Sequence, residues 1–196
     1  MANTSRAEKW KNTIREMVVY NLFPPRIASD LLLHSYFTDF VFDTTGKNSC
    51  FITGTVGSGK TTLACKLLLD HAKEQYLNNQ TVLGAVAFWS VPTLLQDIRT
   101  CYATDDRQQE SSLLSALINT PYIVLDDLGA EKTTEWVLQT LYLTISSRYD
   151  SGKTTIITSN LSLDELAEKL GDRIASRIAG MSEIITLEDI DHRVSC

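Results

Sequence analysis

The sequence is poor in the side chains that build disulfide frameworks, zinc sites and membrane spans. Its 196 residues include four cysteines and three histidines. The cysteines, at positions 50, 65, 101 and 196, form no C-x-x-C pair, which favours reduced thiols and a cytoplasmic protein over a disulfide framework or zinc site. No apolar run is long enough to span a bilayer and no signal peptide is visible, so we expect no membrane association.

Basic side chains are also in deficit. There are 18 lysines and arginines against 24 aspartates and glutamates, which gives a net charge of −6. This negative charge argues against tight, sequence-independent binding of duplex DNA, which needs many phosphate contacts. It does not exclude a local nucleic-acid groove. The length and the hydrophobic fraction of 43% suit one domain with a substantial core.

What the sequence does contain is a complete phosphate-binding loop, G-x-x-x-x-G-K-[ST], at residues 54–61. Its glycines let successive backbone N–H groups point at phosphate oxygens. Lys60 can reach the terminal phosphates, and the Thr61 hydroxyl can ligate Mg²⁺. We therefore predict ATP and Mg²⁺ as cofactors. The expected nucleotide contacts lie in the loop and the next helical turn, at Gly54, Val56, Gly57, Ser58, Gly59, Lys60, Thr61 and Thr62.

The surroundings of this loop fit the motif, because a predicted strand (50–53) precedes it and a predicted helix (62–76) follows it. The pentapeptide Ser-Gly-Lys-Thr-Thr recurs at residues 151–155. This second copy has Ser147 where the first glycine belongs, and it precedes a strand instead of following one. It is interpreted as a turn without a phosphate role.

Strands and helices alternate along the rest of the chain, which predicts an open, mostly parallel α/β sheet. Ser162 and Glu165 form a capping box, and Gly171 ends the same helix. The polar stretch 104–112 is predicted to be a mobile loop. The further strands are expected at 82–89, 122–126, 154–159 and 183–187, and the further helices at 92–102, 135–149 and 163–170.

Residues 5–20 are predicted to form an amphipathic helix, stopped by Pro24 and Pro25. Two interpretations stay open: the helix packs on its own domain, or it is an arm that binds a partner. We divide the chain into an N-terminal arm (1–26) and an ATPase domain (27–196). The apolar face of the arm is made by Trp10, Ile14, Met17 and Val18.

The apolar strand 122–126 ends in two carboxylates, Asp126 and Asp127. Parallel strands place their ligand sites at their carboxyl ends, so both acids are expected beside the phosphate loop. Asp126 is predicted to hold Mg²⁺ together with Thr61, and Asp127 to orient the attacking water. Alternatively, either acid caps the next turn.

Three more polar side chains are candidates for the same site. Asn160 follows strand 154–159 and can sense the terminal phosphate or the water, unless it only begins a loop. Arg173 and Arg177 share a face if residues 172–179 are helical. Their guanidinium groups suit phosphate charge, or else they pair with Glu168 or Asp172 on an exposed helix.

In this order, the phosphate loop, Asp126-Asp127-Leu128-Gly129, Thr158-Ser159-Asn160 and residues 173–177 resemble the AAA+ ATPases of the bacterial replicative-helicase loaders (DnaC-like) and the IstB-type transposition helpers. The similarity covers roughly residues 23–193. It implies a five-stranded AAA+ sheet in which the Asn160 strand lies between the phosphate-loop strand and the Asp126 strand. It further implies Asn160 as sensor 1 and Arg177 as an arginine finger supported by Arg173.

The resemblance also implies partners: a homo-oligomer joined through the arginine finger, a replicative helicase and single-stranded DNA. Two features depart from the family pattern. Only about 25 residues precede the core, and few follow the last strand, so no full C-terminal lid is expected. Asp127 stands where many AAA+ proteins have glutamate, which predicts slow hydrolysis.

Four functions are therefore compared. A helicase loader driven by ATP hydrolysis is favoured, and a transposition helper ATPase is its nearest rival. A small-molecule kinase is disfavoured because stretch 104–112 carries only Arg107, too little for a basic lid. A nucleotide-binding scaffold without turnover would need Lys60 and Thr61 but neither Asp127 nor Arg177. Arg99 and Arg107 are possible DNA contacts or simply solvated surface arginines.

Overall fold

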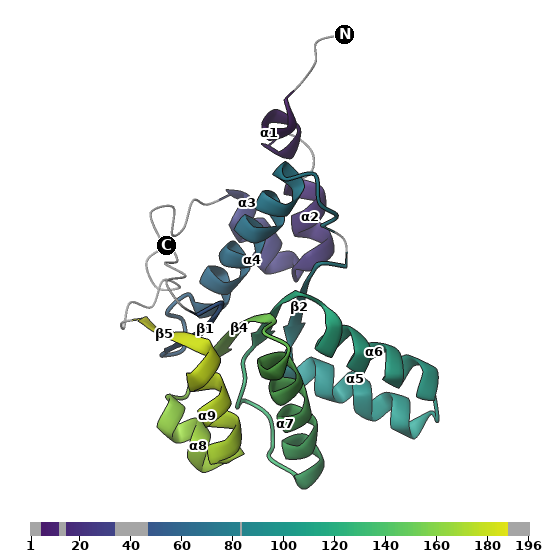
Figure 1. Ribbon diagram of the computed structural model, residues 1–196, viewed down its shortest axis with the longest axis vertical. Helices are drawn as coiled ribbons and strands as arrows, with labels where there is room; N and C mark the ends of the chain where they lie inside the picture. The colour runs from purple at the N-terminus through teal and green to yellow at the C-terminus, as the bar shows by residue number, and fades with distance from the viewer. Residues whose placement is uncertain (1–4, 12–14, 34–46, 83, 188–196) are drawn as a thin grey trace.

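The computed structural model describes residues 5–11, 15–33, 47–82 and 84–187 (Figure 1). Within them, five strands form one sheet in the order β2-β3-β4-β1-β5, and every neighbouring pair is parallel. The predicted sheet is confirmed, and β4 does lie between β1 and β3. The strands are β1 (Ser49–Gly54), β2 (Val86–Ser90), β3 (Tyr122–Asp126), β4 (Thr154–Ser159) and β5 (Ser182–Leu187).

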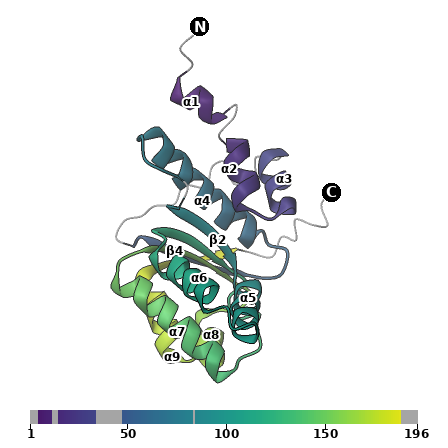
Figure 2. The same ribbon diagram turned by 90° about the vertical axis from the view of Figure 1, so that its right-hand side faces the viewer.

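Helices cover both faces of the sheet. Helices α1 to α4 lie on one side of it, and helices α5 to α9 lie on the other (Figure 2). Neighbouring strand residues point to opposite faces, so Ile52 joins the core under α4 while Phe51 joins the other core. The helices are α1 (Arg6–Lys9), α2 (Arg15–Leu22), α3 (Pro25–Leu33), α4 (Lys60–Leu77), α5 (Val91–Ala103), α6 (Arg107–Asn119), α7 (Glu135–Asp150), α8 (Leu163–Leu170) and α9 (Asp172–Met181).

The predicted mobile loop at 104–112 is wrong, because most of it belongs to α6. Asp106 caps that helix, and its side chain accepts a hydrogen bond from the Gln109 N–H at 3.0 Å. The polar residues of the first turns face solvent, whereas Leu117 further along is buried. The prediction failed because the polar first turns of α6 have the composition of a loop.

The second strand also begins later than predicted, at Val86 instead of residue 82. Gly84 has a left-handed backbone (φ +83°), and the Ala85 N–H donates to the Val82 carbonyl across this turn. The turn at residues 151–152 between α7 and β4 agrees with the prediction for the second Ser-Gly-Lys-Thr-Thr copy. The capping box of α8 and its stop at Gly171 are likewise confirmed.

The N-terminal segment contains two helices, α1 and α2, and residues 12–14 between them lie outside the described residues. Trp10 is 3% exposed and its ring centroid is 5.6 Å from that of Tyr76 at the end of α4. Arg6 stacks over the same ring, and its Nε donates to the Tyr76 carbonyl at 3.1 Å. Of the two open interpretations, packing on its own domain is the one observed for these side chains.

The other predicted features of the two termini are described in part. Val18 is buried in the same core as Trp10, while Ile14 and the Met17 side chain lie outside the described residues. The proposed boundary at 26/27 falls inside α3, and the division into arm and domain stays a prediction. So does the absence of a lid, because residues 188–196 are not described.

Three further predictions concern thiols and membranes. Cys50, Cys65 and Cys101 are free and buried, and burial raises the pKa of the Cys50 thiol to about 12. Cys196 lies outside the described residues. Over the described ranges, the chain contains no helix that combines the length and apolar composition needed to cross a bilayer.

Arg148 of α7 is a fully buried cation (0% exposed) that joins α6, the link between α6 and β3, and strand β4. It donates to the last carbonyls of α6, which have no partner within the helix. The desolvation of its guanidinium lowers the Arg148 pKa to about 10. Its acceptors are the hydroxyl of Thr155 and the carbonyls of Leu117, Ile118, Thr120, Pro121 and Thr154.

We expect Arg148→Met to lower the free energy of unfolding by about 3 kcal/mol or more, because it leaves several buried carbonyls without donors. Urea unfolding followed by circular dichroism measures this. The exposed Arg26→Met change on α3 is the control and should shift stability by less than about 0.5 kcal/mol. Equal stabilities of the two variants would contradict the structural role of Arg148.

Candidate functional site

The candidate site lies where the phosphate loop and the carboxyl ends of β3 and β4 meet. The loop joins β1 to the first turn of α4, and β4 separates β1 from β3 in the sheet. Because all these strands run in parallel, their carboxyl ends share one edge of the sheet. The order and parallel direction of the strands therefore bring the predicted nucleotide, metal and water residues to one edge of the sheet.

The glycines of the loop have backbone conformations that other residues rarely adopt. Gly57 and Gly59 both have φ of +90°, and Gly59 is the N-cap of α4. Gly54 has no room for a side chain, since an added Cβ would be 2.5 Å from the Leu187 carbonyl oxygen of β5. The end of β5 thus helps to impose glycine at the start of the motif.

Lys60 folds back over its own loop. Its side chain is 6% exposed, and Nζ donates to the carbonyls of Gly54 at 2.8 Å and Thr55 at 2.6 Å. The Ser58 hydroxyl is buried and has no hydrogen-bond partner among the described residues. A buried ammonium and an unsatisfied hydroxyl within a left-handed glycine turn fit a phosphate group as ligand.

Asp126 is a buried carboxylate held by two hydroxyl groups. Its Oδ1 accepts hydrogen bonds from Thr61 at 2.8 Å and from Thr158 at 2.7 Å. The side chain is 6% exposed, and this burial raises the Asp126 pKa. A divalent cation beside the carboxylate would offset the cost of desolvation, and the oxygen donors of Thr61 and Asp126 suit Mg²⁺. The predicted metal pair is therefore in direct contact.

Asp127 has a left-handed backbone with φ of +59°. Its N–H donates to the Thr158 hydroxyl at 2.9 Å, and its carbonyl accepts from the Ala130 N–H at 3.2 Å. Both contacts use the backbone, so the half-buried side chain is not needed to form the turn. A strained non-glycine residue beside a phosphate loop is typical of a functional position.

Two charged side chains hold the turn after Asp127 in place. The Gly129 N–H donates to Oε2 of Glu131 at 3.1 Å, and Lys169 of α8 donates to the Gly129 carbonyl. Glu131 is 9% exposed, its Oε1 has no partner among the described residues, and burial raises its pKa. These contacts tie the loop after β3 to α8.

Asn160 is exposed directly after β4, and its role stays a prediction. Arg173 is exposed in the first turn of α9, and Arg177 lies one turn further on the same helix. Within the described ranges neither arginine forms an ion pair, so the predicted alternative of pairing with Glu168 or Asp172 is not observed. The guanidinium of Arg177 instead lies over the ring of Tyr142.

Sequence reasoning missed four side chains at this edge: Thr158, Ser159, Glu131 and Lys169. Thr158 joins Asp126 to the backbone of Asp127, and the Ser159 hydroxyl donates to the Leu128 carbonyl at 2.6 Å. The hydroxyl residues Thr158 and Ser159 at the carboxyl end of β4, directly before Asn160, were the available signal. No local pattern indicated Glu131 or Lys169, because their contact depends on how α8 packs.

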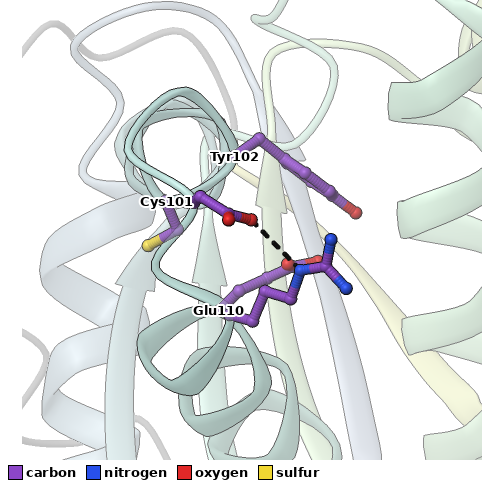
Figure 3. A pocket seen from close by; sticks show the side chains of 5 residues that line it. Cys101, Tyr102 and Glu110 are labelled. Atoms are coloured by element: carbon purple, nitrogen blue, oxygen red, sulfur yellow. Dashed lines mark hydrogen bonds and ion pairs between the residues drawn. The ribbon is translucent and has the colours of Figure 1, made fainter.

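A separate pocket of about 400 Å³ opens between α5 and α6 (Figure 3). None of the predicted site residues lines it. Arg107 and Asp105 form an ion pair of 3.1 Å on its rim, so the charge of Arg107 is partly satisfied within the chain. The lining residues are Cys101, Tyr102, Asp105, Arg107 and Glu110.

The parallel sheet, the glycine loop and the Thr61–Asp126 contact define a P-loop nucleoside triphosphatase of the AAA+ type. Residues 26–193 match the family of IstB-like ATP binding proteins, and the chain belongs to that family.

Among curated proteins, the chain is similar to the replicative helicase loader DnaI of Bacillus subtilis (strain 168), with 26% identity over 142 residues. That alignment covers 70% of this chain and 42% of DnaI, so the chain spans less than half of this relative.

Solved structures agree with this fold. A DnaC helicase loader has 26% identity and a TM-score of 0.58, and the match covers 86% of this chain and 95% of that one. The initiator DnaA bound to AMPPCP and single-stranded DNA matches in fold alone, with 18% identity and a TM-score of 0.58 over 87% of this chain and 49% of DnaA.

We expect the change Glu131→Gln to make stability less dependent on pH. Burial raises the folded-state pKa of Glu131, so its neutral form is favoured, and stability is lost as pH rises from the unfolded pKa through the folded one. Glutamine keeps the acceptor for Gly129 without the charge. The difference between the urea midpoint of the variant and that of the parent should therefore increase as the pH rises above about 4.5.

The exposed Glu168→Gln change controls for the loss of one negative charge. A midpoint difference for Glu131→Gln that does not grow with pH would show that the Glu131 carboxylate bears no cost of burial.

Proposed function

We propose that this protein is an ATPase that loads a replicative DNA helicase onto single-stranded DNA. The observation that carries the enzymatic part is the buried contact of Asp126 with Thr61, next to the phosphate loop. The partner is inferred from similarity to DnaI and DnaC, whose names describe helicase loaders. Because the chain spans 42% of DnaI, the helicase and DNA parts of the proposal rest on likeness alone.

In the proposed mechanism, the N–H groups of residues 54–61 bind the phosphates, and Lys60 leaves the loop carbonyls to contact the terminal phosphates. Thr61 and Asp126 would hold Mg²⁺, which would supply positive charge to balance that of the phosphates. Asp127 orients a water molecule for attack, and Asn160 senses the terminal phosphate. Arg177, supported by Arg173, contacts the nucleotide of a neighbouring copy, so that ATP promotes a homo-oligomer.

ATP binding and hydrolysis would then act through differential affinity. The assembled, DNA-binding state must bind ATP more tightly than the separated state does, because a ligand shifts an equilibrium only by that difference. Hydrolysis removes the terminal phosphate that Asn160 and Arg177 contact, and thereby releases the assembly.

We expect Asp127→Asn to lower the ATP hydrolysis rate about 10²-fold or more while leaving ATP affinity nearly unchanged, because only the orientation of water is lost. Phosphate release without added acceptor and equilibrium binding of a fluorescent ATP analogue measure the two quantities. Lys60→Ala should lose binding as well. The exposed Asp97→Asn change is the control, and an unchanged rate in Asp127→Asn would refute the proposed role.

The loader function predicts that the purified protein captures a bacterial replicative helicase and speeds its unwinding of a forked substrate in the presence of ATP. Lys60→Ala should retain helicase capture less well and should not stimulate unwinding. The family match favours one rival, a transposition helper, which would bind duplex DNA and a transposase instead. Capture of a transposase together with no effect on any helicase tested would decide for that rival.

A further inference from the structure

Arg177 lies against the face of an aromatic ring. Its guanidinium carbon lies 5.0 Å from the ring centroid of Tyr142, which projects from α7 toward α9. Figure 1 shows α7 and α9 packed side by side, and the contacts between these helices agree. An arginine over an aromatic face is attracted by the negative charge of the π-system.

The hydrogen-bonding capacity of Arg177 is largely unused. Its Nε is buried and has no partner among the described residues, and within the same residues it forms no ion pair. The side chain as a whole is half-exposed. The ring therefore holds the guanidinium by its face while leaving donors on its edge for an anion that the chain itself does not supply.

The two helices that make this contact are firmly seated. Ile174 and Ile178 of α9 are buried in the core below the sheet. One heptad beyond Tyr142, Tyr149 lies over Gly180, where an added Cβ would be 3.1 Å from the Tyr149 ring. Two tyrosines on one face of α7 thus contact α9, one through an arginine and one through a glycine.

We propose that Tyr142 is a positioning residue that stacks on the Arg177 guanidinium and presents its edge to the terminal phosphate of a nucleotide bound by a second copy of this chain. This inference rests on the proposed function, since it needs Arg177 to act between copies. Arginine loses much side-chain freedom on binding an anion, and a ring that already restrains it reduces that loss.

The proposal predicts that the aromatic face matters and that the tyrosine hydroxyl does not. Tyr142→Phe should keep the maximal hydrolysis rate within about twofold. Tyr142→Leu should lower it between about twofold and thirtyfold, the range spanned by exposed and desolvated cation–π contacts. The loss should appear in the maximal rate, because a guanidinium contact to the terminal phosphate strengthens as negative charge develops there in the transition state.

The test is a double-mutant cycle in the full chain. Hydrolysis rates are measured with excess single-stranded DNA for the parent, Tyr142→Leu, Arg177→Ala and the double variant. We expect Tyr142→Leu to have no further effect once Arg177 is alanine, which a merely structural role would not produce. Self-association with a non-hydrolysable ATP analogue, followed by sedimentation, should show the same dependence.

Tyr149→Leu is the matched control, because it perturbs the same helix pair without touching an arginine. It should change the thermal midpoint but leave the rate equally sensitive to Arg177→Ala. If Tyr142→Leu fails to fold, Tyr142→Met serves in its place. Equal losses in the Phe and Leu variants, or a loss that persists in the Arg177→Ala background, would overturn the role of Tyr142.

Failure of the underlying function has a different signature. Mixing Lys60→Ala with Arg177→Ala subunits should restore hydrolysis that neither shows alone. If Arg177→Ala keeps the full parental rate, the arginine finger itself is refuted and the inference goes with it. If the mixture recovers activity but Tyr142→Leu matches the parent, only the role of Tyr142 is refuted.

Discussion

One buried carboxylate organises the edge of this sheet. Asp126 accepts hydrogen bonds from Thr61 of α4 and Thr158 of β4, and Thr158 in turn accepts from the Asp127 N–H. Three elements that are far apart in the chain therefore meet at one acid. A negative charge with so little solvent contact is costly, and the two hydroxyl groups offset only part of that cost. The burial of this acid is compatible with the Mg²⁺ site proposed for Asp126 and Thr61, because a cation beside the carboxylate would offset the remaining cost.

The same acid begins a chain of contacts that leads away from the phosphate loop. The turn after β3 is fixed by Ser159, Glu131 and Lys169, and Lys169 belongs to α8. Helix α8 packs against α9, which carries Arg173 and Arg177. A continuous series of contacts therefore links the phosphate loop to the helix that carries Arg173 and Arg177.

The parallel sheet and the phosphate loop could be predicted from local patterns: alternation of elements, glycine spacing and carboxylates after an apolar run. The strand order was predicted only through the resemblance to the AAA+ helicase loaders. Local patterns failed at α6, where Asp106 begins a helix with polar first turns, and at β2, which Gly84 delays. Glu131 and Lys169 were out of reach, since their contact depends on the packing of α8 against a turn far away in the sequence. Tyr142 was out of reach for the same reason, because its contact with Arg177 depends on how α9 packs against α7.

Helix α4 connects the phosphate loop to the N-terminal segment. Its 18 residues span about 27 Å, from the lysine of the glycine loop to Tyr76, on which Arg6 and Trp10 rest. The first turn of α4 thus belongs to the phosphate loop, and its last turn contacts Arg6 and Trp10. A molecule that binds residues 6–10 would therefore contact the same helix whose first turn carries Lys60 and Thr61.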